Sequence, residues 1–94
     1  MNYETYKASL RNPTPPAALT ETTLALWYDG VGRWEDSHHI AQDIDNKDGA
    51  RIHAYLHRKE GDDGNAMYWY QNSGEPFFEG TLEEEWEMLV NRYL

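Results

Sequence analysis

The stretch ARIHAYLHRKEGDDGNAMYWYQNSGEP, residues 50–76, decides the fold because it contains two helices and the turn between them. Its helical pattern is interrupted by GDDG at residues 61–64, and it ends at Gly74 with Pro76 two residues further on. A glycine after the last helical residue and a proline just beyond it are typical helix stop signals. These signals predict a helical hairpin over residues 48–74.

The apolar and small residues of this hairpin have the spacing of buried helix faces. In the first helix, positions i, i+3, i+4 and i+7 are Ala50, His53, Ala54 and His57. In the second helix, the same spacing gives Ala66, Trp69, Tyr70 and Ser73. Ile52 and Leu56 lie on another face of the first helix, so we expect other helices to contact it on two sides. The small side chain of Ala66 predicts a close approach of the two helices.

The chain before this hairpin predicts a second pair of helices, over residues 14–46, preceded by an N-terminal arm, residues 1–13. Thr14 is a favourable N-cap and Pro15 suits the first helical position, so we expect a helix to begin there and to end near Tyr28. The next helix is amphipathic, with spacings of three and four between Trp34, Ser37, His38, Ala41 and Ile44.

The carboxyl-terminal residues 81–94 predict a helix that closes the stack. Thr81 and Glu84 have the spacing of a capping box, and the acidic run 83–85 suits the positive end of a helix. One apolar stripe contains Leu82, Trp86, Leu89, Val90 and Tyr93. No segment alternates with the period of a strand. The sequence therefore predicts one all-α domain, residues 1–94, of four to five helices as two antiparallel hairpins and a closing helix.

Composition excludes several classes of function. Eight Lys and Arg against seventeen Asp and Glu give a net charge of −9, which disfavours nucleic acids and anionic membranes as partners. The absence of cysteine excludes disulfides and thiolate ligands and favours a cytoplasmic location. Neither a signal peptide nor a membrane span is expected. Four Trp, seven Tyr and two Phe are a heavy aromatic load, which fills the core or lines a groove.

The central stretch resembles a tetratricopeptide repeat in its second half. The matching positions are Gly61, Asp62, Ala66, Tyr70, Ser73 and Pro76. The first-helix half departs from the pattern, and the interval from Gly32 to Gly61 is 29 residues, whereas the repeat has about 34. The resemblance implies degenerate tetratricopeptide-like hairpins. The segments LWYDG, HAYLHRKEGD and NAMYWY also resemble a group of short uncharacterised bacterial and fungal proteins over residues 24–90, and that resemblance implies no particular activity.

The histidines are the main candidates for chemistry. His53 and His57 are four residues apart on one helix, within reach of a single ion, and His38 on the preceding antiparallel helix is a possible third ligand. The zinc-protease motif requires Glu directly after the first His, where this chain has Ala54. Histidine pairs on helices also serve structural hydrogen bonds. From the sequence we therefore assign no metal ligand, no catalytic residue and no cofactor.

Two functional interpretations remain open. The first is a non-enzymatic interaction or small-ligand-binding module with an aromatic and His-lined groove. Its predicted ligand-binding residues are Trp34, His38, His53, His57, Glu60, Asn65 and Trp69. In the alternative, the same side chains form an internal hydrogen-bond network in which acids such as Asp36, Glu60 and Asp62 bond to the imidazoles. The second interpretation is a small metal-dependent or acid–base hydrolase that uses His38, His53 and His57. A protein, a peptide or a small molecule is the expected kind of partner, and we expect the chain to be a monomer or a homodimer.

Overall fold

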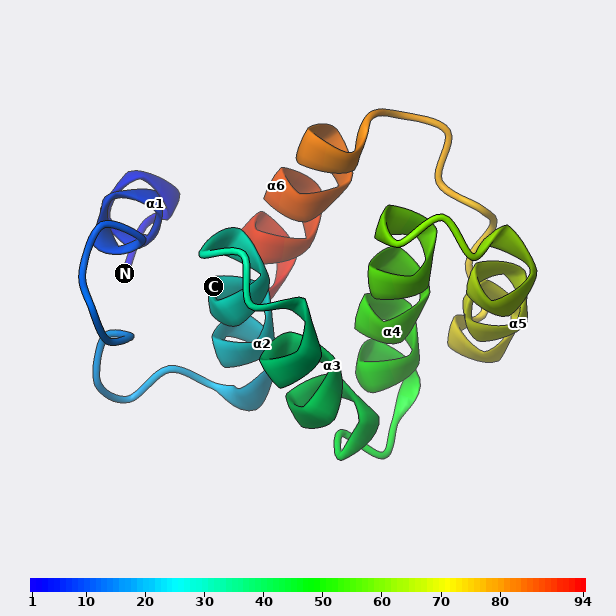
Figure 1. Cartoon of the computed structure of the whole chain (residues 1–94), viewed down its shortest axis with the longest axis horizontal. Helices are drawn as coiled ribbons and strands as arrows, with labels where there is room; N and C mark the ends of the chain where they lie inside the picture. The colour runs from blue at the N-terminus through cyan, green and yellow to red at the C-terminus, as the bar shows by residue number, and fades with distance from the viewer.

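Six helices and no strand make up the computed structural model, which describes all residues from Met1 to Leu94 (Figure 1). The helices are α1 (Tyr3–Ser9), α2 (Glu21–Gly30), α3 (Trp34–Gln42), α4 (Lys47–Lys59), α5 (Asp63–Ser73) and α6 (Leu82–Tyr93). This confirms the all-α prediction, but the count exceeds the four to five helices expected, because residues 3–9 of the predicted N-terminal arm form α1. The helices α2 and α3 pack as one hairpin and α4 and α5 as another, also as predicted. None of the six is both long and apolar enough to cross a lipid bilayer.

Helix α4 is the centre of the fold and packs against α2, α3, α5 and α6. Every residue from position 49 to position 57 is buried, which confirms the predicted contacts on two sides. Ala54 and Ala66 are both fully buried and form a small cluster with Tyr70, so the short side chains let α4 and α5 approach closely. The turn after α5 uses Gly74 at φ 78°, the left-handed conformation expected of a helix C-cap glycine.

Two predicted helix starts are wrong. Helix α2 begins at Glu21, where the Thr20 side chain caps it, and not at Thr14. The reason is the Pro15-Pro16 pair, because a residue that precedes proline is disfavoured in the helical conformation. Helix α4 is capped by Asn46, whose Oδ1 accepts from the backbone N–H groups of residues 48 and 49 at 2.9 and 3.1 Å. The predicted hairpin begins at residue 48, which lies inside the helix instead.

Helix α1 lies at the edge of the molecule and is joined to α2 by a long loop (Figure 1). Its buried Tyr6 donates a hydrogen bond to the Thr23 carbonyl, and the rings of Tyr3 and Tyr6 lie 6.2 and 6.0 Å from that of Trp86. Trp86 belongs to α6, which begins with the predicted capping box and packs on α2 and α4. The indole of Trp86 donates to the Leu26 carbonyl at 3.0 Å, so one side chain joins α1, α2 and α6.

A buried ionic network joins α4, α5 and α6. Glu85 is fully buried, and its carboxylate oxygens lie 2.7 Å from Arg51 Nη1 and 2.8 Å from Arg58 Nη1. The contact to Arg51 is an ion pair without a well-aligned hydrogen bond. Tyr70 donates its hydroxyl to the same carboxylate, and burial followed by this bond raises the pKa of Tyr70. The sequence interpretation used Glu85 only as a charge at the helix terminus and missed this role.

Candidate functional site

Three histidines converge where α3 packs on α4. His38 Nε2 and His53 Nε2 are 2.8 Å apart. The His57 ring centroid lies 4.9 Å from that of His53 and 5.2 Å from that of His38. One ring nitrogen from each histidine lies within 4.8 Å of the other two. Successive turns of α4 supply His53 and His57, both buried, and α3 supplies the half-buried His38.

Two tryptophans hold the histidine rings from opposite ends of the cluster. Trp34 stacks on His38 with centroids 4.9 Å apart and planes 13° from parallel. Trp69, from α5, stacks on His53 at 3.9 Å and 11°. Trp34 is itself fixed, because its indole N–H donates to the Leu56 carbonyl at 2.9 Å. The stacking restricts rotation of the imidazoles, so the cluster is preorganised.

A carboxylate orients the third histidine. Glu60, the residue that ends α4, places Oε1 2.6 Å from His57 Nδ1. When Nδ1 carries the proton of this bond, the lone pair of the neutral ring lies on Nε2. A carboxylate bound to one nitrogen of an imidazole is the usual outer-shell partner of a metal-binding histidine.

Six of the seven residues predicted for the site lie in this cluster or directly on it. Asn65 does not: it is exposed in the first turn of α5, where its backbone N–H bonds to Asp62. Asp36 holds no imidazole and instead pairs with Arg33 at 2.7 Å. A cavity of about 340 Å³ lies beside the cluster, where His53 and Trp69 form part of its wall.

Burial keeps two of the imidazoles neutral. Burial, followed by the repulsion of His38 and His57, lowers the pKa of His53 to about 4. The pKa of His38 is also lowered, mainly by burial and then by His57, although Glu60 opposes the shift. Both rings are therefore neutral at pH 7, and each has one ring nitrogen with a lone pair. The neutral imidazole is the form that coordinates divalent ions in proteins, and an ion with three protein ligands keeps a fourth position for water.

We expect acid to destabilise the protein through His53. Unfolded His53 takes up a proton near its ordinary pKa of 6.5, whereas the folded protein takes it up near pH 4. The unfolded state therefore binds more protons between these values, so stability falls as the pH is lowered through this window. The full shift in the pKa of His53 corresponds to a loss of about 3 kcal/mol in the free energy of unfolding. Urea unfolding of the metal-free protein at pH 7, 5.5 and 4 measures it.

The matched variant is His53→Phe, which keeps a ring beside Trp69 and does not titrate. Its unfolding free energy should decline less steeply between pH 7 and 4 than that of the unmodified chain. Identical pH dependence in the two proteins would show that His53 is not the titrating group.

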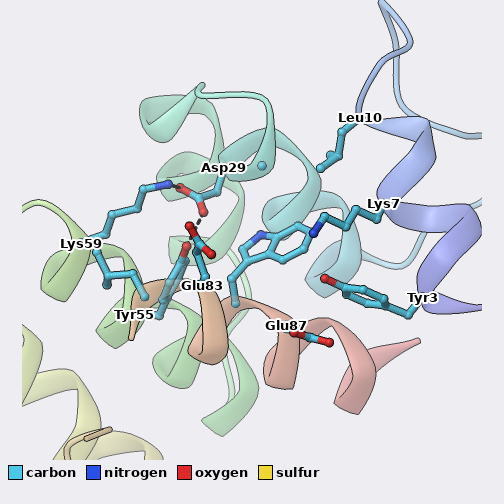
Figure 2. Close-up of a pocket in the computed structure, with 11 residues that line it drawn as sticks. Tyr3, Lys7, Leu10, Asp29, Tyr55, Lys59, Glu83 and Glu87 are labelled. Carbon is cyan, nitrogen blue, oxygen red and sulfur yellow. Dashed lines mark hydrogen bonds and ion pairs between the residues drawn. The ribbon is translucent and has the colours of Figure 1, made fainter. Parts of the chain in front are cut away.

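A second polar constellation lies away from the histidines, in a cavity of about 520 Å³ (Figure 2). Asp29 is 2% exposed there and accepts hydrogen bonds from Tyr55 at 2.6 Å and from Lys59 at 3.0 Å. Burial and then the charge of Asp29 raise the pKa of Tyr55. Sequence reasoning gave Asp29 no role in a site and missed this cavity. No local spacing signals it, because the partners are 26 and 30 residues apart.

No protein-family model matches the chain, and neither a curated protein nor a solved structure matches it.

Proposed function

We propose that this protein is a helical binding module whose ligand is a divalent transition-metal ion, coordinated by His38, His53 and His57. One observation carries the proposal: three imidazoles from two helices each place a ring nitrogen within 4.8 Å of the others. Imidazole nitrogen is a preferred ligand of Zn²⁺, Cu²⁺ and Ni²⁺, whereas Mg²⁺ and Ca²⁺ prefer oxygen. The ligand set therefore favours zinc or a neighbouring ion.

The distances fit an ion after small movements. Zinc bonds imidazole nitrogen at about 2.0–2.1 Å, and tetrahedral geometry then separates the nitrogens by about 3.3 Å. The 2.8 Å pair of His38 and His53 must open by about 0.5 Å, and the His57 nitrogen, which lies within 4.8 Å of the other two, must also come to about 3.3 Å from each. The ion then replaces the direct hydrogen bond between His38 and His53.

The surroundings of the three nitrogens support coordination over a purely structural role. Glu60 holds His57 as outer-shell carboxylates hold metal ligands. Trp34 and Trp69 stack on the other two rings and reduce the side-chain entropy that binding removes. Without a metal ion, the side chains of His38 and His53 have no hydrogen-bond partner except each other. A purely structural role therefore leaves much of their bonding capacity unused.

Calorimetric titration of metal-free protein with Zn²⁺ tests the proposal. We expect one ion per chain for the unmodified protein and at least a hundredfold weaker binding for His53→Ala, because an outer-shell partner alone contributes about ten- to a hundredfold. His39→Ala is the matched control: His39 is exposed, directly follows His38 and lies outside the cluster, so its removal should leave affinity unchanged. Equal zinc binding by His53→Ala and the unmodified protein would place the ion elsewhere.

A further inference from the structure

We infer that the cavity between α1, α2, α4 and α6 binds a primary ammonium group carried on a short apolar stem. This cavity, of about 520 Å³, is the larger of the two described above and shares no residue with the histidine cluster (Figure 2). Its volume is in the range of small-molecule sites. The site is independent of the proposed metal ion, and either can exist without the other.

Charge selects a cation for this cavity. Three carboxylates line it, those of Asp29, Glu83 and Glu87, against two ammonium groups, those of Lys7 and Lys59. The whole chain carries a net charge of −9, so the field around the entrance attracts cations and repels anions. An anionic ligand would have to enter against both the local and the overall charge.

The buried carboxylate of Asp29 has unused acceptor positions. Its Oδ1 accepts one hydrogen bond from Lys59 and its Oδ2 accepts one from the Tyr55 hydroxyl. Each carboxylate oxygen has two lone pairs, so one acceptor position on each oxygen is unused. Figure 2 shows the Asp29 carboxylate between Lys59 and Tyr55, within the residues that line the cavity. A ligand ammonium that reaches Asp29 can therefore bond to it without taking the acceptor position that Lys59 uses.

Aromatic and aliphatic side chains supply the rest of the site. The Trp86 and Tyr3 rings line the cavity, and aromatic faces attract ammonium groups. Lys7 Nζ already lies 5.9 Å from the Tyr3 ring centroid, and Lys59 Nζ lies 3.0 Å from Asp29. The lining thus accommodates two of the protein's own ammonium groups. Leu10 and Leu82 also line the cavity and provide contacts for an apolar stem.

NMR titration of the full chain with n-butylammonium chloride, at constant ionic strength and with EDTA present, tests this inference. The Trp86 indole N–H, which donates to the Leu26 carbonyl, is the reporter, and the Trp69 indole beside the histidines is the internal reference. We expect a saturable shift at Trp86 and none at Trp69. The neutral probe n-butanol, of similar size, should bind at least tenfold more weakly.

Variants at the exposed carboxylates test the charge requirement without disturbing the buried Asp29. The double variant Glu83→Gln with Glu87→Gln should weaken n-butylammonium binding at least threefold, whereas Glu79→Gln, an exposed carboxylate outside the cavity, should not. Asp29→Asn should weaken binding at least tenfold if it folds. Equal affinity for n-butanol and n-butylammonium, or no saturable shift at Trp86, would overturn the inference.

Discussion

Glu85→Ala is expected to lower the free energy of unfolding by about 3–5 kcal/mol, the usual result of removing one partner of a buried ion pair. Glu85 is fully buried and Arg51 is 2% exposed, so the substitution leaves a guanidinium in the interior with only the partly exposed Glu75, 3.2 Å from its Nε, as a counter-charge. Arg58 and the Tyr70 hydroxyl lose the same carboxylate. Urea unfolding followed by circular dichroism measures the loss.

The matched control for this substitution is Glu83→Ala, two residues earlier in the same helical turn. Glu83 is exposed and forms no ion pair, so only its interaction with the helix dipole is lost, about 0.3–1 kcal/mol. A loss below 1 kcal/mol for Glu85→Ala would mean that water reaches the guanidinium and that the network is not buried in solution.

Trp86→Ala, made as a separate single variant, is expected to lower the free energy of unfolding by about 3–5 kcal/mol and to release α1 from the other helices. The Trp86 ring is 8% exposed and contacts Tyr3 and Tyr6, so its removal leaves a cavity beneath α1. The Leu26 carbonyl also loses its indole donor. Urea unfolding measures the loss of stability, and trypsin cleavage after Arg11, in the loop that follows α1, measures the release.

Tyr68→Ala is the control for this aromatic truncation. Tyr68 is 57% exposed on α5, so its removal should change the unfolding free energy by less than about 0.5 kcal/mol. Trypsin should cleave this control no faster than the unmodified chain. If Trp86→Ala has the same free energy of unfolding as the unmodified chain and resists trypsin at Arg11, then α1 is held by contacts other than the Trp86 ring.

Local signals explain why much of the fold could be predicted. The capping box of Thr81 and Glu84, the C-cap Gly74 and the close contact at Ala66 each depend on neighbouring residues and are confirmed. The predicted start of α2 was wrong because the sequence offers two possible N-caps, Thr14 and Thr20. Thr14 is followed by two prolines, and the second proline disfavours a helical conformation at the first, so the later Thr20 begins the helix.

The histidine cluster was partly predictable for the same reason. The spacing of His53 and His57 places them on one face of α4, and an antiparallel neighbour brings His38 toward them. Glu85 gives a weaker signal, since it lies between Leu82 and Leu89 on the apolar side of α6. Its partners Arg51 and Arg58 lie on another helix, and spacing along the chain carries no information about such pairs.

Visible absorption of metal-free protein titrated with Co²⁺ tests the metal site most directly, because the spectrum reports both stoichiometry and coordination geometry. Three imidazoles and one water predict the intense absorption of tetrahedral Co²⁺, complete at one ion per chain. The signal should disappear in His38→Ala and His53→Ala, persist in His39→Ala, and be displaced by Zn²⁺. A weak octahedral spectrum that is the same in all four proteins would contradict a metal site at His38, His53 and His57.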